Sequence, residues 1–187
     1  MDETDDGEDF AQESTAERII RLTGDISEET SEKFILNLHR VAKIPGEIIV
    51  IISSDGGDIE EGLRIIDAIQ LAKSSACPIK TVTSGKAYSM AAYIACTGDT
   101  RTIYRHSRLM FHGGRFEGTD DGKVLTTAEL RKMHDELSLY NGVFREILEG
   151  IGLDCHTVDR MLSEDVYLNA EEAISLGIVH SIETEII

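Results

Sequence analysis

Two periodicities of apolar residues alternate along the chain from residue 18 onward. Short aliphatic runs at Arg18–Thr23, Glu47–Ser53 and Pro78–Thr83 predict strands. The second run is apolar almost throughout, which is typical of a strand covered on both faces. Between these runs, apolar residues recur at helical spacing over Ser27–Lys43 and again in the segment that begins at Ile59. The first half of the chain therefore predicts strands that alternate with helices.

The second half continues this alternation. The small residues of Ser89–Thr97 predict a short helix, and Arg101–Tyr104 and Arg108–His112 predict two short strands. A glycine-rich stretch, Gly113–Gly122, precedes a long helix from about Thr126 to Glu149. Three further elements are expected: a short helix near Val158, a helix over Ala170–Leu176 and a last strand over Ile178–Ile182. The alternation indicates an α/β fold with a largely parallel sheet.

Residues 1–17 differ from the rest of the chain in composition. They contain acidic side chains and no Lys or Arg, and Phe10 is their one large apolar residue besides Met1. Such a segment buries too little apolar surface to offset its loss of conformational entropy. We expect a disordered acidic tail over residues 1–17 and a single domain over residues 18–187.

Composition and charge exclude several classes of function. The net charge of -17 and the lack of a basic stripe argue against nucleic acid as a partner. No apolar run is long enough to span a bilayer, and the acidic N-terminus does not resemble a secretory signal, so we expect a cytoplasmic protein. Cys77, Cys96 and Cys155 are far apart and form no C-x-x-C pair. They are interpreted as buried, reduced thiols rather than redox or metal sites.

Candidate chemistry lies at two junctions where a strand is followed by a helix. In open α/β sheets, ligands bind at such junctions. The first, Ser53–Asp58, contains two adjacent glycines that permit a close backbone approach. The second, Gly85–Ala91, places Ser89 at the start of a helix, where free N–H groups favour developing negative charge. A serine at a helix start can also be a plain N-cap, and a Gly-Gly turn can be only a turn.

A serine nucleophile requires a base, and His112 is the best placed of the six histidines. It ends the apolar run Leu109–His112 and precedes Gly113 and Gly114. The other five lie in predicted helices or polar surroundings and are expected to be structural or at the surface: His39, His106, His134, His156 and His180. The residue pattern alone does not select the carboxylate that would orient His112.

Five blocks of sequence, in order, resemble those of ClpP-type serine peptidases, the proteolytic subunits of the ATP-dependent Clp protease. They cover nearly the whole chain from Arg18: Arg18-Ile-Ile-Arg-Leu-Thr-Gly24, Ser54-Asp-Gly-Gly57, Gly85-Lys-Ala-Tyr-Ser-Met-Ala91, Ser107-Arg-Leu-Met-Phe-His112 and Asp165-Val-Tyr-Leu-Asn-Ala-Glu-Glu-Ala173. Each block is weak by itself, but the set is specific.

The resemblance implies a Ser-His-Asp triad. In that family pattern Ser89 attacks the scissile carbonyl, His112 transfers the proton and Asp165 orients the imidazole. The backbone N–H groups of Gly57 and Met90 would form the oxyanion hole. No metal or organic cofactor is expected.

The resemblance also implies an architecture and an assembly. The fold would be the ClpP/crotonase-like spiral of repeated β-β-α units, with the long helix from Thr126 as the handle by which rings meet. The protein would form stacked heptameric rings, cleave peptides or unfolded proteins within them, and work with an AAA+ unfoldase. The glycine-rich Gly113–Gly122 would help to line the substrate groove.

Departures from the family pattern bear on these expectations. Asp55 replaces a proline and adds a charge near the oxyanion hole, while Tyr88 is expected to narrow a pocket. Gly113 and Gly114 replace a Gln-Pro pair that bears on substrate binding and ring contacts. Aliphatic residues over 49–51 stand where relatives carry a Tyr-rich docking strand, and the N-terminal region is short and acidic. The unfoldase partnership is therefore less supported than the chemistry.

Three alternatives remain open at this level. A crotonase-type acyl-CoA enzyme would share the fold and the oxyanion hole. A catalytically silent ring subunit or assembly scaffold would share the fold without the reaction. A Ser-Lys peptidase would use Lys86, although a surface lysine is the better interpretation of a residue three positions before Ser89.

Overall fold

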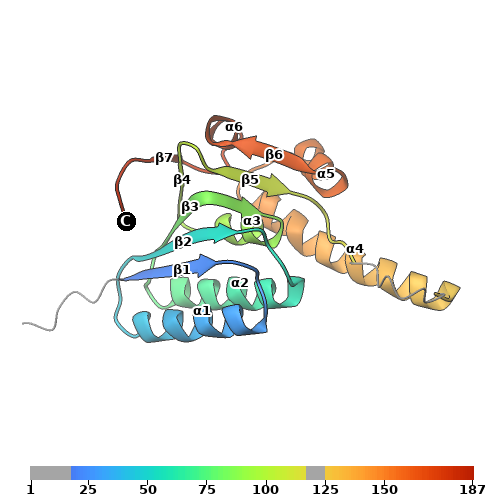
Figure 1. Ribbon diagram of the computed structural model, residues 1–187, viewed down its shortest axis with the longest axis horizontal. Helices are drawn as coiled ribbons and strands as arrows, with labels where there is room; N and C mark the ends of the chain where they lie inside the picture. The colour runs from blue at the N-terminus through green and yellow to red at the C-terminus, as the bar shows by residue number, and fades with distance from the viewer. Residues whose placement is uncertain (1–17, 117–124) are drawn as a thin grey trace, which may run out of the picture.

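The computed structural model describes residues 18–116 and 125–187. Their strands form one sheet, with helices α1 and α2 side by side beneath it in Figure 1. The predicted acidic tail and residues 117–122 of the glycine-rich stretch lie outside the described residues. Within the described ranges, no helix combines the length and apolar composition that crossing a bilayer requires.

Seven strands make up the sheet. They are β1 (Ile19–Thr23), β2 (Ile48–Ser54), β3 (Ile79–Tyr88), β4 (Thr100–Tyr104), β5 (Arg108–Phe111), β6 (Val166–Asn169) and β7 (Ser181–Glu183). The main path runs β1-β2-β3-β4-β7, and all of its pairings are parallel. The far end of β3 pairs with β5, and β6 adds to β5 in the antiparallel direction. The expected α/β fold with a largely parallel sheet is confirmed.

Within the described residues, six helices connect these strands. They are α1 (Glu28–Val41), α2 (Ile59–Ser74), α3 (Met90–Ala95), α4 (Thr127–Gly150), α5 (Cys155–Ser163) and α6 (Ala170–Ser175). Local sequence explains where they begin. Ser27 and Thr126 each form a capping box with the third residue of the helix that follows, and Asp58 caps α2. Figure 1 shows α4 leaving the body of the molecule, with its first turns far from the sheet.

The buried face of the sheet is aliphatic. Ile48, Val50 and Ile52 of β2, which point to one face of the sheet, have no exposed surface. On the other face Ile51 is buried but Ile49 and Ser53 are partly exposed, so this face is covered less completely than expected. The ring of Tyr93 in α3 stacks on Phe144 of α4, with centroids 4.1 Å apart, and meets Phe111 of β5 edge-on at 5.5 Å. This aromatic cluster fixes α3, α4 and β5 to one another.

Three details differ from the sequence-based expectations. Strand β6 was not predicted, and β3 runs five residues beyond Thr83 to end at Tyr88. Cys77 and Cys96 are buried as expected, but Cys155 is exposed at the first residue of α5, so the prediction was wrong for this cysteine.

Candidate active site

Ser89 occupies a strained turn between β3 and α3. Its backbone has φ 53° and ψ -128°, in the region that non-glycine residues rarely adopt. Its N–H donates to the carbonyl of Met110 in β5 at 2.8 Å, which ties the turn to the neighbouring strand. The hydroxyl caps no N–H of α3, so the N-cap interpretation of Ser89 is not supported. Serine peptidases and esterases of the α/β-hydrolase type present their nucleophile on a similarly strained strand-to-helix turn.

The Gly56-Gly57 turn packs directly against Ser89. Gly56 has φ 101°, and a Cβ atom at this position would lie 2.7 Å from the Cβ of Ser89 and 2.7 Å from the carbonyl oxygen of Tyr88. Gly57 has φ 145°, and its backbone lies against Ile26 with no room for a side chain. The turn therefore requires glycine at both positions because of contact as well as conformation.

The backbone N–H groups of Gly57 and Met90 flank this serine. Neither donates a hydrogen bond to any residue in the described ranges. Two unengaged N–H groups from the two turns, one adjacent in sequence to Ser89, are suited to bind an oxygen that develops negative charge.

His112 follows directly after β5 and is held by its main chain. Its carbonyl oxygen accepts a hydrogen bond from the buried Tyr93 hydroxyl at 2.8 Å. Its imidazole Nδ1 lies 2.5 Å from the carbonyl oxygen of Gly113. Gly114, two residues after His112, donates its N–H to Oδ1 of Asn141 in α4 at 2.8 Å. Helices α3 and α4 together therefore position the segment that carries the histidine.

Asp165 lies opposite His112 at the end of the β5–β6 ladder. The last pair in the register joins Phe111 to Val166, and one further antiparallel step brings His112 level with Asp165. The carboxylate of Asp165, however, contacts the guanidinium of Arg115 rather than the imidazole. Within residues 18–116 and 125–187, His112 makes no hydrogen bond to Ser89 or to Asp165.

Most of these groups open into one cleft of about 730 Å³. Its lining includes four of the five residues expected at the site: Ser89, His112, Gly57 and Met90. Asp165 does not line it but is linked to it through Arg115, which does. The described part of the glycine-rich stretch, residues 113–116, also lines the cleft.

The residues that depart from the family pattern have different environments. Asp55 lies on the cleft and forms an ion pair with Lys86 at 2.5 Å, in which both side chains are substantially exposed. Lys86 is therefore a surface lysine, as the preferred interpretation held. Tyr88 was expected to narrow a pocket, but it lies outside this cleft and packs edge-on against Tyr167 at 5.7 Å.

Sequence reasoning missed three residues that shape the site: Tyr93, Arg115 and Asn141. Tyr93 and Asn141 hold the backbone around His112, and Arg115 holds Asp165. Of the three, only Tyr93 could have been noticed from the sequence, because a tyrosine is unusual in a segment made mostly of small residues. Arg115 and Asn141 carry no such signal, because their role depends on contacts with distant parts of the chain.

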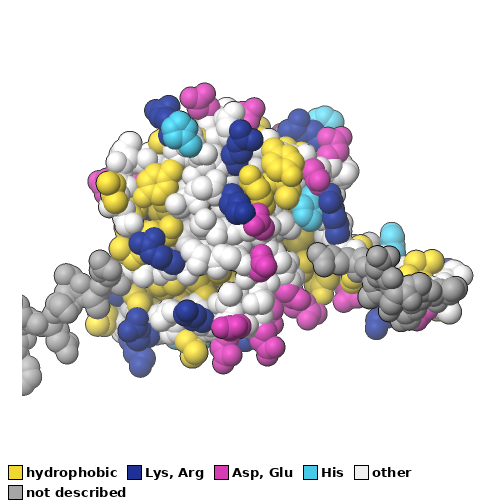
Figure 2. Space-filling view, in the orientation of Figure 1, with side chains coloured by type: hydrophobic (Ala, Val, Ile, Leu, Met, Phe, Trp, Pro, Cys, Tyr) yellow, Lys and Arg dark blue, Asp and Glu magenta, His cyan; other side chains and the backbone are white. Residues whose placement is uncertain are grey.

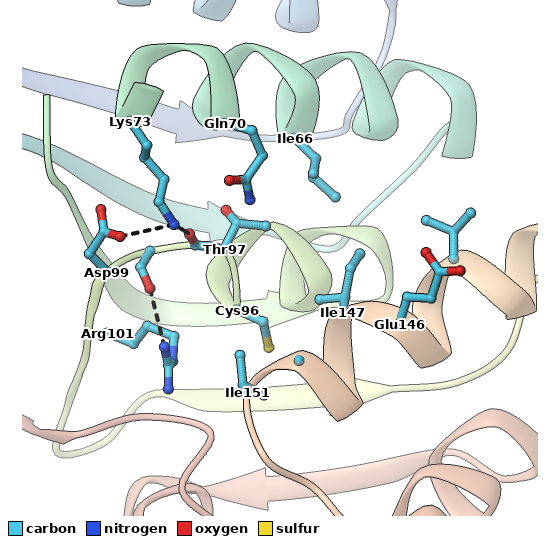
Figure 3. A pocket seen from close by; sticks show the side chains of 13 residues that line it. Ile66, Gln70, Lys73, Cys96, Thr97, Asp99, Arg101, Glu146, Ile147 and Ile151 are labelled. Carbon is cyan, nitrogen blue, oxygen red and sulfur yellow. Dashed lines mark hydrogen bonds and ion pairs between the residues drawn. The ribbon is translucent and has the colours of Figure 1, made fainter. Parts of the chain in front are cut away.

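A second cleft, of about 510 Å³, lies between α2, α4 and the end of α3 (Figure 3). The two basic side chains that line it already have partners. Lys73 contacts the Asp99 carboxylate and the carbonyl of Thr97, each at 3.0 Å, and Arg101 donates to the Ile178 carbonyl at 2.7 Å. Burial raises the pKa of the Cys96 thiol to about 12, so this thiol is a poor nucleophile. Among the described side chains, no group of three or more His, Cys, Asp or Glu is arranged to hold a metal ion.

Comparison with known proteins gives one consistent result. A family model described as Clp protease matches residues 3–185. The ATP-dependent Clp protease proteolytic subunit of Pleurastrum terricola is 27% identical over 173 residues, covering 90% of this chain and 85% of the relative. The ATP-dependent Clp protease proteolytic subunit 1 of Prochlorococcus marinus (strain MIT 9312) is 32% identical over 172 residues, covering 87% of this chain and 82% of the relative.

Proposed function

The chain belongs to the Clp protease family, and we propose that it is a serine endopeptidase that acts through Ser89, His112 and Asp165. The observation that carries the proposal is the meeting of three features in one cleft. These are a serine on a strained turn, two unengaged backbone N–H groups beside it, and a histidine on the adjacent strand end.

In the proposed reaction, the Ser89 hydroxyl oxygen attacks the scissile carbonyl carbon while His112 accepts the hydroxyl proton. The N–H groups of Gly57 and Met90 bind the resulting oxyanion, and one such donor is typically worth about 10²–10³ in rate. The C–N bond then breaks as His112 donates its proton to the leaving amine. Water, deprotonated by His112, hydrolyses the ester on Ser89, releases a carboxylic acid product and restores the serine.

The proposal requires Asp165 to exchange partners. Its carboxylate must leave Arg115 and accept a hydrogen bond from Nδ1–H of His112, which now faces the Gly113 carbonyl. Both ends of the Arg115–Asp165 pair are exposed, at 58% and 42%, so separating them costs little. Because the register of β5 and β6 continued by one step brings His112 level with Asp165, we expect side-chain rotation to allow this exchange.

Assembly would enclose this site. We infer stacked heptameric rings from the family resemblance. The projecting helix α4 supports a contact between subunits, because it exposes Leu130 and Leu139, which are 52% and 72% accessible. Enclosure would restrict cleavage to small or unfolded polypeptides in the cytoplasm. The two relatives are named as subunits of an ATP-dependent protease, which supports an AAA+ unfoldase as the corresponding partner.

One observation favours a second candidate, a catalytically silent ring subunit. The contact between Arg115 and Asp165 leaves the triad without its hydrogen bonds in this conformation. A crotonase-type enzyme, by contrast, finds no support in the comparisons, which match the Clp protease family over nearly the whole chain.

A fluorophosphonate probe that labels activated serines distinguishes the two candidates. The assembled native protein should be labelled, and Ser89→Ala should abolish labelling at unchanged particle mass. Ser175→Ala is the matched control, since Ser175 is exposed on α6 and its hydroxyl bonds only to the Glu172 carbonyl. A well-formed particle that is not labelled would exclude the peptidase and leave the silent subunit.

A further inference from the structure

The cleft that contains Ser89 is strongly acidic. Four carboxylates line it: Asp55, Asp58, Glu60 and Glu136. Its one Lys or Arg among the described residues is Arg115, whose charge is used by Asp165. Figure 2 shows that acidic side chains also gather on the side of the body where α1 and α2 begin.

Two of these four carboxylates already interact with partners in the protein. Asp55 is paired with Lys86 at 2.5 Å, and Oδ1 of Asp58 caps α2 by accepting the N–H of Glu61 at 3.0 Å. Glu60 and Glu136 form no ion pair with any described residue. These two charges are therefore the ones available to a ligand.

Glu60 and Glu136 meet at a single hydroxyl. The Tyr140 hydroxyl lies 3.1 Å from Oε1 of Glu60 and 3.4 Å from Oε1 of Glu136. Burial and the hydrogen bond to Glu60 raise the pKa of Tyr140 to about 12, so the hydroxyl keeps its proton at neutral pH. One proton can satisfy only one of the two carboxylates, and the two negative charges repel one another unless a cation lies between them.

The rest of the cleft suits the stem of a long cationic side chain. Ile59, Met110 and Phe116 line it beside the carboxylates. Lys and Arg side chains lay their methylene groups along apolar surface while the charged end reaches polar partners. An apolar wall that leads to two carboxylates matches this shape and charge.

We propose that the cleft selects polypeptides with a Lys or Arg side chain beside the scissile bond, and that Glu60 and Glu136 bind its charged group. The inference rests on the proposed peptidase function of Ser89 and specifies its substrate class. The net charge of -17 acts in the same direction, because it attracts cationic chains and repels acidic ones.

The test compares fluorogenic peptides that differ at one position only. Lysine and norleucine, which have the same stem length, are exchanged in turn at each position flanking the scissile bond. The assembled protein is assayed with a chelator so that no divalent cation occupies the carboxylates. We expect kcat/KM for the best lysine peptide to exceed that of its norleucine counterpart about tenfold, the effect of a charged hydrogen bond.

The double variant Glu60→Gln and Glu136→Gln keeps the size of both side chains and removes their charge. Its lysine-to-norleucine ratio should fall to near one. Glu146→Gln is the matched control, because Glu146 is exposed on the same helix and lines the other cleft, so it should keep the native ratio. Binding of the same two peptides to Ser89→Ala, measured by fluorescence anisotropy, gives a readout that does not depend on catalysis.

The outcomes separate this inference from the function on which it rests. Cleavage and serine labelling with equal rates for lysine and norleucine would overturn the selectivity and leave the peptidase intact. A tenfold preference that persists in the double variant would overturn the assignment to Glu60 and Glu136. Absence of both labelling and cleavage, with equal binding of the two peptides to Ser89→Ala, would overturn both proposals.

Discussion

At the scale of single residues, side-chain orientation decides the state of the candidate triad. Ser89, His112 and Asp165 come from three different segments, and β5–β6 pairing places the last two at the same level. The guanidinium of Arg115 nevertheless competes for the Asp165 carboxylate. A triad depends on how the aspartate orients the imidazole, so this competition bears directly on the reactivity of Ser89.

Replacing Arg115 by glutamine should therefore raise the rate at which the fluorophosphonate labels Ser89. The exposed ion pair is worth at most about 1 kcal/mol, so the expected increase is no more than about fivefold. Labelling kinetics of the assembled protein measure the effect. Arg105→Gln is the control, because the Arg105–Glu171 pair, at 3.9 Å, is exposed and lies outside the cleft. A lower rate in Arg115→Gln would mean that Arg115 supports the triad instead.

At the scale of elements, two turns create the site. The turn after β2 supplies Gly56 and Gly57, and the turn after β3 supplies Ser89 and Met90. They touch because the parallel pairing of β2 and β3 continues as far as Ser54 and Ala87, so both strands end at the same edge of the sheet. The contact leaves no space for a Cβ atom at Gly56.

Gly56→Ala should remove serine labelling and reduce the free energy of unfolding by more than Gly24→Ala does. Both glycines have positive φ, 101° and 78°, but only Gly56 faces neighbouring atoms within 4 Å. Gly24→Ala therefore reports conformational strain alone, about 1–2 kcal/mol, and the excess at Gly56 reports the contact with Ser89. Urea denaturation of the two variants measures the difference. Equal losses of stability, with labelling intact in both, would contradict a tight packing of the two turns.

At the scale of the whole molecule, the projecting helix α4 is the outstanding feature. The aromatic cluster of Tyr93, Phe111 and Phe144 anchors its second half, whereas its first turns lie away from the sheet in Figure 1. Two apolar side chains of α4 are largely exposed: Leu130 in its first turn, and Leu139 near its middle. Burial of such a surface in an assembly would be favourable by about 25 cal/mol per Å².

Leu139→Asp should reduce the mass of the assembled particle, because it places a charge in the surface by which rings are proposed to meet. We expect a shift from double to single rings at micromolar concentration, measured by sedimentation velocity. Ser138→Asp, which adds the same charge at an adjacent exposed position of α4, is the control and should keep the native mass. An unchanged mass in Leu139→Asp would place the ring contact elsewhere.

The sequence by itself determined the order of most elements and pointed to Ser89 as the candidate nucleophile. Helix α1, strand β2 and helix α4 follow from local periodicity and capping residues, which act over a few neighbouring positions. The placement of Ser89 and of the Gly-Gly turn at strand ends followed in the same way. The role proposed for Asp165 came only from the resemblance of sequence blocks, since no local pattern distinguishes it from other carboxylates.

Tertiary structure alone decided the features that depend on distant partners. Strand β6, which was not predicted, is defined by its antiparallel pairing with β5, a segment distant from it in the sequence. The ring of Tyr88 packs against Tyr167, which lies 79 positions later in the sequence, and the Asp165 carboxylate contacts the guanidinium of Arg115, which lies 50 positions earlier. Glu60 and Tyr140 are 80 residues apart in sequence, and they meet because α2 and α4 both border the Ser89 cleft. Local propensity is set by neighbours along the chain, whereas the polarity of a cleft is set by which elements pack around it.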